Sequence, residues 1–233
     1  LEREQELYKL DSLRAEGFFT SSDIAGTLPQ CPKGAVIIDF TAPDATMRTA
    51  EAAAANGNPM VIGTTGLSDE QLARLQELAA IIPIMRSANM SVGINVIMDI
   101  LPRLASMLGD DYDVEMMEIH HNKKKDAPSG TALLLAAPLL QAKGLSKKAV
   151  NTNRFESLQP RRHDEIGIQS LRGGDVVGVH TIYFFGEGER IELTHHAHSR
   201  INFAKGALRA ARWITAQQPS KLYTMQDVLH NII

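Results

Sequence analysis

Residues 118 to 133 read E-I-H-H-N-K-K-K-D-A-P-S-G-T-A-L, and parts with different chemistry follow one another in this stretch. Residues 114 to 119 alternate and are rich in apolar and β-compatible side chains, a pattern that predicts a strand. This strand ends at His120 and His121, and the charged loop K-K-K-D over residues 123 to 126 follows. We therefore expect two histidines to be delivered to the edge of a lysine-rich loop.

The segment P-S-G-T, residues 128 to 131, ends this loop and predicts the start of a helix over residues 132 to 140. Ser129 or Thr131 can cap that helix. A helix N-terminus offers free backbone N–H groups and a partial positive charge. With histidine and lysine nearby, this segment suits an anion such as a carboxylate, next to groups that can donate a proton.

Each of these features also has a structural interpretation. A lysine triplet is usually a solvated loop, and neighbouring histidines on a strand point to opposite faces. Taken singly, each is more often structural than catalytic. Together they bring four kinds of anion or proton contact within reach of one loop, which favours a functional site.

The stretch resembles the signature E-x-H-H-x-x-K-x-D-A-P-S-G-T-A of the dihydrodipicolinate reductases, pyridine-nucleotide enzymes of the diaminopimelate route to lysine. Every fixed position of that signature is present. The resemblance implies that His120 is the proton donor and that Lys124 is the second catalytic residue. It also implies that His121 binds substrate, and that the backbone of Gly130 and Thr131 holds a substrate carboxylate.

Length and composition are those of an ordinary globular protein. The 233 residues suffice for one large or two small domains, and 44% of them are hydrophobic and 22% charged. The net charge of −3 gives no reason to expect a nucleic-acid partner. A single cysteine, Cys31, fits a reducing cytoplasm. No uninterrupted apolar run reaches the ~20 residues of a membrane helix, so we expect no membrane partner.

The first part of the chain alternates between strands and helices, which is the pattern of a Rossmann-like α/β domain with a parallel sheet. A buried parallel strand is predicted over residues 35–40, further strands over 59–62 and 81–85, and helices over 45–56 and 68–80. Ligands bind such sheets at the carboxyl ends of the strands. The loop G-T-T-G is weak evidence by itself, because such turns are common. The resemblance implies that NADH or NADPH is bound by Gly63, Thr64, Thr65, Ser87, Ala88, Asn89 and Met90.

The chain opens on Leu1, Glu2 and Arg3. From the residues alone, Glu2-Arg3 is a frayed charged terminus. The family carries a Glu-Arg pair that contacts the adenosine ribose, and the resemblance extends to Glu2 and Arg3. It implies that the first strand, the glycine loop and the first helix precede Leu1. An acid favours NAD and an arginine favours NADP, so the preference between NADH and NADPH stays open.

The second part of the chain predicts an α+β domain with a mostly antiparallel sheet. A helix over 94–108 leads into it, and strands over 167–171, 176–185 and 190–197 form an antiparallel meander. A helix is predicted over 203–215. We expect a dinucleotide-binding domain formed by 1–92 with 201–233, and a substrate-binding and tetramerisation domain over 93–200. One face of the antiparallel sheet is free to bury against another subunit, as in a homotetramer.

The sequence H-H-A-H at residues 195 to 198 suggests metal binding, because strand alternation places His196 and His198 on one face. The sequence has no matching cluster of Cys, Asp or Glu at the usual spacing. We therefore interpret these residues as surface or intersubunit histidines and expect no metal.

The leading hypothesis is NAD(P)H-dependent reduction of 4-hydroxy-tetrahydrodipicolinate, a small dicarboxylate, to tetrahydrodipicolinate. A different oxidoreductase of the same architecture, such as an amino-acid or aldehyde dehydrogenase relative, would lack the H-H-x-x-K-x-D-A-P-S-G-T segment. A non-catalytic dinucleotide-binding regulator is the third hypothesis, which the residues His120 and Lys124 oppose. Nucleotide binding without turnover would distinguish the regulator from the enzyme.

Overall fold

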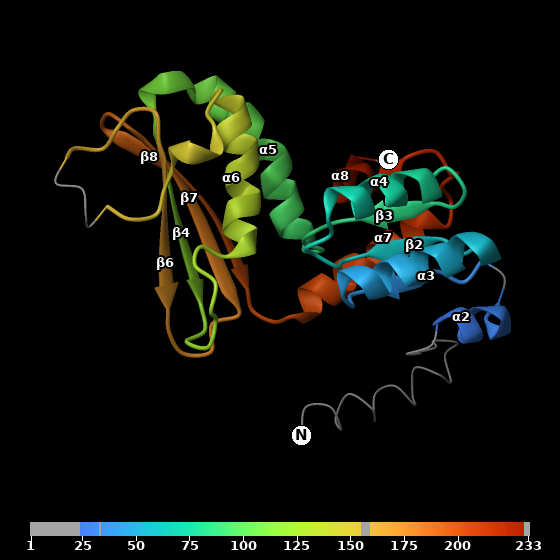
Figure 1. The fold of residues 1–233 in the computed structure, drawn as a ribbon. Coiled ribbons are helices and arrows are strands. Elements are labelled where there is room, and N and C mark those ends of the chain that lie inside the picture. Colours follow the sequence, from blue (N-terminus) through green and yellow to red (C-terminus); the bar gives the residue numbers. More distant parts are fainter. Residues whose placement is uncertain (1–23, 33, 155–158, 231–233) are drawn as a thin grey trace. The chain divides into compact units, whose positions relative to one another are not determined.

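The computed structural model describes two compact units (Figure 1). The described residues are 24–32, 34–154 and 159–230. The first unit draws on residues 1–88 and 209–224, and the second on residues 89–208 and 225–233. The domain boundaries at 92/93 and 200/201 stay a prediction.

The first unit is a parallel sheet with helices. Its strands follow the spatial order β1-β2-β3-β9, and every neighbouring pair is parallel. Its elements in chain order are α2 (Ile24–Thr27), η1 (Leu28–Gln30), β1 (Ile37–Asp39), α3 (Pro43–Asn56), β2 (Met60–Ile62), α4 (Asp69–Leu78), β3 (Ile84–Arg86) and β9 (Leu222–Tyr223). The helix α7 (Ile201–Ile214) spans the boundary between the units.

Apolar strands and amphipathic helices create the core of this unit. All three residues of β2 are fully buried, as expected for a central strand of a parallel sheet. Helix α4 starts with a capping box, in which Ser68 and Gln71 satisfy each other's backbone N–H groups. Leu75 and Leu78 of α4 pack against Ile62 and other core residues. The predicted alternation of strands and helices is confirmed.

Strand β1 differs from the buried strand that the run A-V-I-I-D-F predicts. Asp39 is buried, but Ile38 is 38% exposed and Phe40, just after the strand, is 53% exposed. Among the described residues, β1 is an edge strand that pairs with β2 alone. The strand predicted from the apolar run at residues 35–40 is therefore present, but the prediction that it is buried is wrong.

The second unit is a five-stranded sheet covered by helices on one face. Its elements in chain order are α5 (Val92–Leu108), η2 (Gly109–Asp111), β4 (Asp113–His120), α6 (Gly130–Ala142), η3 (Lys147–Ala149), β5 (Val150–Asn151), β6 (Ile166–Arg172), β7 (Gly178–Gly186), β8 (Glu189–Ala197) and α8 (Met225–His230). Helices α5 and α6 lie side by side against this sheet (Figure 1).

The predicted antiparallel meander is wrong at its first strand. The spatial order is β5-β6-β4-β7-β8, so β4 lies between β6 and β7. β6 pairs with β4 in parallel, whereas β7 pairs antiparallel with both β4 and β8. Helix α6 supplies the crossover that a parallel β4–β6 pair requires. The predicted turn at residues 186–189 joins β7 to β8, and the sheet is mixed and mostly antiparallel.

Alternation along β4 explains the core of this unit. Val114 and Met116 are buried against the helices, and the intervening residues of β4 are partly exposed on the other face. Residues 92–111 are long and apolar enough to cross a membrane by length and composition. In the structure, Leu101 and Ala105 of this segment are buried in the core with β4 and α6.

Candidate active site

A buried carboxylate, Glu118, organises the end of β4. Its side chain is 1% exposed, and Arg172 at the end of β6 donates to both of its oxygens, at 2.8 and 2.7 Å. The backbone N–H of Ser129, just before α6, donates to the Oε1 atom at 3.1 Å. Burial raises the pKa of Glu118, but hydrogen bonds from Arg172, Ser170 and His120 lower it to about 2. Glu118 is therefore a fixed anion that joins β4, β6 and the start of α6.

His120 is oriented by this anion. Its Nδ1–H donates to Glu118 Oε2 at 2.6 Å, which leaves Nε2 as the ring atom available for a ligand. A Cβ on Gly178 would lie 3.0 Å from that Nε2 atom, so glycine at this position keeps the space beside it open. Burial lowers the pKa of His120 below its usual value, with Glu118 opposing the effect, while Lys124 and Arg172 lower it further.

A second buried histidine lies against the first. The rings of His180, on β7, and His120 meet edge to face with centroids 5.1 Å apart. Ser129 Oγ lies 3.0 Å from His180 Nε2 and accepts from the N–H of Ala132, so its own proton is free to donate to the imidazole. Burial, and then the charge of His120, lower the pKa of His180 to about 4. At neutral pH His180 is uncharged and supports the site without competing for its proton.

The backbone after β4 is fastened by the connection between β6 and β7. The amide of Gly173 donates to His120 O at 2.9 Å, and those of His121 and Asn122 donate to Val176 O at 2.8 Å and Gly174 O at 3.2 Å. This connection crosses the carboxyl end of β4, because β6 and β7 lie on opposite sides of that strand. The backbone of His121 is thus fixed by main-chain contacts.

The three lysines of the loop have different surroundings. Lys123 and Lys125 are exposed, whereas the side chain of Lys124 is 21% exposed and its ammonium lies 2.9 Å from Asp126 Oδ1. The charge of Lys124 also acts on His120. Among the three, Lys124 is therefore the one turned towards the end of β4.

The start of α6 has the form that P-S-G-T predicts. Ser129 is the N-cap, and its hydroxyl accepts from the N–H of Ala132 at 3.1 Å. Gly130 is exposed, which leaves this end of the helix accessible. Thr131 Oγ1 accepts a hydrogen bond from Asn89 Nδ2 at 3.0 Å. This bond joins one predicted substrate residue to one predicted cofactor residue within the second unit.

The remaining predicted cofactor residues follow strands of the first unit, except Met90. Gly63 N–H donates to Asp39 O at 2.8 Å, and Ser87 N–H donates to Ile62 O at 3.0 Å, so both loops begin where the strands end. A Cβ on Gly63 would overlap the ring of Phe40, at 2.1 Å. Thr64 is buried, Thr65 and Ala88 are exposed, and Met90 is 2% exposed in the second unit. Glu2 and Arg3 lie outside the described residues.

Two buried polar atoms at the same edge of the parallel sheet lack a partner among the described residues. They are Asp39 Oδ2 and Arg86 Nε, at the ends of β1 and β3. Burial lowers the pKa of Arg86 below its usual value, and no carboxylate of the described residues pairs with it. A polar, partly anionic ligand would satisfy both groups.

The histidines at the end of β8 and just after it point to different partners. His196 and His198 stack with centroids 6.2 Å apart, and His195 instead turns its Nε2 to Ser91 Oγ at 3.2 Å. Within the described ranges, no group of three or more His, Cys, Asp or Glu side chains is placed to hold a metal ion.

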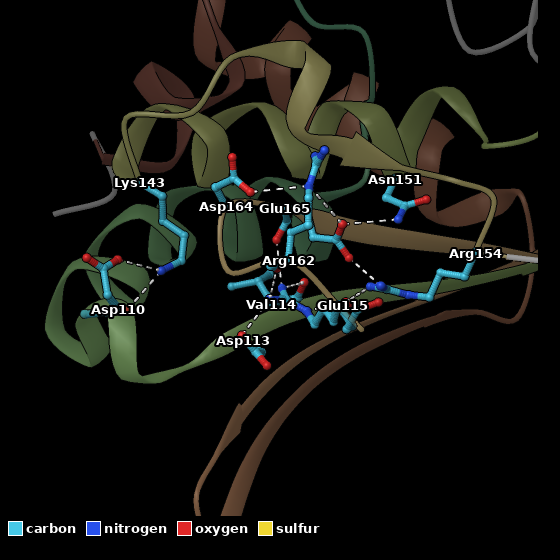
Figure 2. Close-up of polar contacts among 12 residues, drawn as sticks. Asp110, Asp113, Val114, Glu115, Lys143, Asn151, Arg154, Arg162, Asp164 and Glu165 are labelled. Carbon is cyan, nitrogen blue, oxygen red and sulfur yellow. Dashed lines mark hydrogen bonds and ion pairs between the residues drawn. The ribbon is translucent and has the colours of Figure 1, made fainter. Parts of the chain in front are cut away.

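A cavity of about 560 Å³ lies elsewhere, around β5 and the connection to β6. Its lining includes Arg154 and Glu165, which are paired with each other, and Arg154 also pairs with Glu115 (Figure 2). Glu115 lies near the start of β4, away from His120 at its end. Because its charges are already matched, this region serves to hold the connection onto the sheet.

Sequence reasoning missed the residues that support His120. The sequence patterns assigned no role to Glu118, although it lies two residues before His120. They also did not connect Arg172, Ser129 or His180 with His120. The available signal was the alternation of β4, which places a charged residue, Glu118, on the same face as the buried Val114 and Met116.

Comparison with known proteins shows that two parts of the chain match models of one protein family. Residues 2–90 match the family model described as dihydrodipicolinate reductase, N-terminus, and residues 93–229 match its C-terminal counterpart. The 4-hydroxy-tetrahydrodipicolinate reductase of Nitratidesulfovibrio vulgaris (strain DP4) is 55% identical over 91% of this chain and 82% of its own length. That of Geotalea uraniireducens (strain Rf4) is 46% identical over 93% of this chain and 80% of its own length.

Solved structures agree with this. The dipicolinate-bound dihydrodipicolinate reductase from Paenisporosarcina sp. TG-14 matches with a TM-score of 0.70 and 27% identity, over 93% of this chain and 82% of that one. An amine dehydrogenase from Mycobacterium smegmatis matches with a TM-score of 0.50 and 14% identity, over 88% of this chain and 78% of that one. The second likeness shows a shared fold alone.

Proposed function

Because this chain belongs to the dihydrodipicolinate reductase family, we propose that the end of β4 and the start of α6 bind its substrate and protonate it. The enzyme reduces 4-hydroxy-tetrahydrodipicolinate to tetrahydrodipicolinate with NADH or NADPH, in the diaminopimelate route to lysine. The reaction consumes a hydride and a proton and releases water. The observation that supports the proposal is His120, oriented by the buried anion Glu118 next to Lys124.

The cofactor fits the carboxyl edge of the parallel sheet in the first unit. When bound, the nicotinamide cofactor supplies the hydride. We assign its binding to the loop residues Gly63, Thr64, Thr65, Ser87 and Ala88, with Asn89 and Met90 following them. Arg86 adds a cation without a carboxylate partner in the described residues, which suits a phosphate. Glu2 and Arg3 remain a prediction for the adenosine ribose.

Lys124 and the start of α6 hold the substrate carboxylates in this proposal. A charged ammonium and the free N–H groups of Gly130 and Thr131 are suitable donors to a carboxylate. His121 is a further donor beside them. Asn89 fixes the Thr131 hydroxyl, which orients the first turn of the helix.

His120 transfers the proton. Glu118 keeps the ring proton on Nδ1, so the proton that is transferred resides on Nε2 when the ring is charged. Burial disfavours that charge in the free enzyme. A dicarboxylate bound nearby favours it, because an opposite charge raises the pKa of an imidazole. The substrate thus recruits the proton that its own reduction requires.

A non-catalytic nucleotide-binding protein is the second candidate. It would bind cofactor without turning over substrate. The orientation of His120 opposes it, because Glu118 holds Nδ1 and Gly178 leaves the space beside Nε2 open for a ligand. A steady-state assay with substrate and each nucleotide decides between the two candidates.

Lys124→Ala should weaken binding of pyridine-2,6-dicarboxylate by about tenfold or more, because a charged hydrogen bond contributes about 1.5–3 kcal/mol. Lys123→Ala and Lys125→Ala are the matched controls and should have little effect, since both side chains are exposed. Calorimetric titration of the three variants with cofactor present measures this. Equal losses in all three would mean a diffuse basic patch and would remove the specific role of Lys124.

We also propose that the enzyme is a homotetramer assembled through the second sheet. The face opposite α5 and α6 carries the apolar side chains Met117, Ile119, Leu171, Tyr183 and Phe185. Ile119 lies directly beside Leu171 in the register, whereas Tyr183 and Phe185 lie beside Glu115 and Asp113. Leu171 is 45% exposed and Phe185 39% exposed, and the rings of Tyr183 and Phe185 stack 5.5 Å apart. Another subunit packed on this face would bury that surface.

Met117→Lys should dissociate the assembly, because it places a charge in the middle of this apolar face. Met107→Lys is the matched control, since Met107 is 74% exposed on α5 and lies away from the face. Light scattering at micromolar concentration should give four chains for the wild type and the control, and fewer for Met117→Lys. A monomeric wild type would contradict the proposal.

We place the reaction in the cytoplasm. The single cysteine, Cys31, is a free thiol, which is in keeping with a reducing compartment.

A further inference from the structure

The carboxylate of Asp126 lies where the proposed site would hold a carboxylate of its ligand. Asp126 Oδ1 lies 2.9 Å from the ammonium of Lys124. The hydrogen bond from Lys124 holds the pKa of Asp126 below its usual value, and backbone N–H groups, including that of Gly130, add to this. One of the groups assigned to the substrate carboxylate, the ammonium of Lys124, is thus already paired with a carboxylate of the chain.

The backbone and the side chain of Asp126 are held differently. Arg172 donates to the carbonyl oxygen of Asp126 at 2.6 Å, and the same arginine is paired with the buried Glu118. The backbone of Asp126 is therefore tied to a fixed anchor. Its side chain is 58% exposed, so the carboxylate can rotate towards solvent without displacing the loop.

We propose that Asp126 is an internal ligand of the carboxylate site, which holds Lys124 and the start of α6 in the free enzyme and is displaced by the substrate carboxylate. This inference rests on the proposed function of Lys124 and Gly130. It explains why a charged lysine can be kept largely out of solvent before substrate arrives. Substrate binding then exchanges one carboxylate for another, and Lys124 is never left unpaired.

The exchange also contributes to selectivity. A ligand must supply a carboxylate to replace that of Asp126, because a neutral or cationic analogue cannot offer Lys124 an equivalent partner. The affinity for every dicarboxylate is reduced by the competition from Asp126. That reduction is modest, because a partly exposed ion pair is weak.

Asp126→Asn should therefore tighten binding of pyridine-2,6-dicarboxylate by about two- to fivefold, the range expected for losing a partly exposed ion pair. Asp110→Asn is the matched control, because Asp110 pairs with Lys143 at 3.2 Å in the same unit, at the other end of β4. Calorimetry on the full enzyme with cofactor present measures all variants. Lys124→Ala is titrated in parallel.

The outcomes separate this inference from the proposed function. If Lys124→Ala binds the dicarboxylate as the wild type does, the proposed site itself is wrong. If Lys124→Ala loses affinity and Asp126→Asn is unchanged or weaker, the site stands and Asp126 is a positioning partner of Lys124, which overturns the inference. A crystal structure of the dicarboxylate complex distinguishes displacement from simple removal of charge. Displacement requires the Lys124–Asp126 contact to be broken there, and an intact contact also overturns it.

Discussion

Replacing His120 by glutamine should lower kcat by about 10²–10⁴-fold, the usual loss for a general acid. Affinity for the cofactor should change little, because the cofactor residues lie on other segments. Glutamine is close to histidine in size and can still donate to Glu118, so the fold should be retained. His163→Gln is the control, since His163 is an exposed histidine in the connection to β6. Steady-state kinetics with both variants test this, and turnover near that of the wild type would remove His120 from the mechanism.

The pH dependence gives a second measurement of the same group. Burial lowers the pKa of His120 in the free enzyme below 6.5. An acid must be protonated to act, so kcat/KM should fall as the pH rises through that lowered pKa. The corresponding fall in kcat should occur at a higher pH than the fall in kcat/KM, because bound dicarboxylate favours the charged imidazole. Both the fall in kcat/KM and the fall in kcat with rising pH should be absent in His120→Gln.

Replacing Glu118 by glutamine should lower the free energy of unfolding by about 3 kcal/mol at pH 7. The pKa of Glu118 is about 2 in the folded protein against an ordinary value of 4.5, and a shift of that size corresponds to roughly 3 kcal/mol. The substitution also leaves Arg172 with no carboxylate at this position. Glu192→Gln is the control, because Glu192 pairs with Arg190 at the surface, where ion pairs contribute about 0–1 kcal/mol. Urea denaturation followed by circular dichroism measures both variants.

The sign of the pH effect follows from the depressed pKa. The contribution of Glu118 is fully present above pH 4.5 and is lost as the pH falls towards about 2. The difference in stability between wild type and Glu118→Gln should therefore shrink over that window. A difference that stays constant between pH 4.5 and 2 would show that the carboxylate contributes through packing and not through its charge.

Local patterns predicted the segments of this site well. The S-G-T start of α6 and the strand before His120 come from capping preference and alternation, which depend on residues close together in the sequence. Lys124 was distinguished from its neighbours by the resemblance to the family signature, and three adjacent lysines on a short loop cannot all turn inwards. The structure indeed leaves Lys123 and Lys125 exposed.

Contacts between distant segments could not be predicted in the same way. Arg172 follows Glu118 by 54 positions and His180 follows Ser129 by 51. The first contact depends on β6 pairing in parallel with β4, and the second on β7 pairing antiparallel with the other side of β4. A single sequence specifies neither pairing. The incorrect meander had the same cause, since consecutive alternating strands with glycine between them usually pair with each other. The predicted burial of β1, an edge strand among the described residues, was incorrect because apolar composition does not distinguish an edge strand from a central one.

Main-chain hydrogen bonds join the connection that crosses the end of β4 to the residues at the end of that strand. The donors at His121, Asn122 and Gly173, and their carbonyl acceptors, are common to every amino acid other than proline at the donor positions. Side chains along residues 173–177 are therefore open to evolutionary drift, apart from Gly174, whose φ of 53° favours glycine. The side chains at this edge of the site could therefore change during evolution to contact a different neighbour or ligand, while the main-chain hydrogen bonds keep His120 in position.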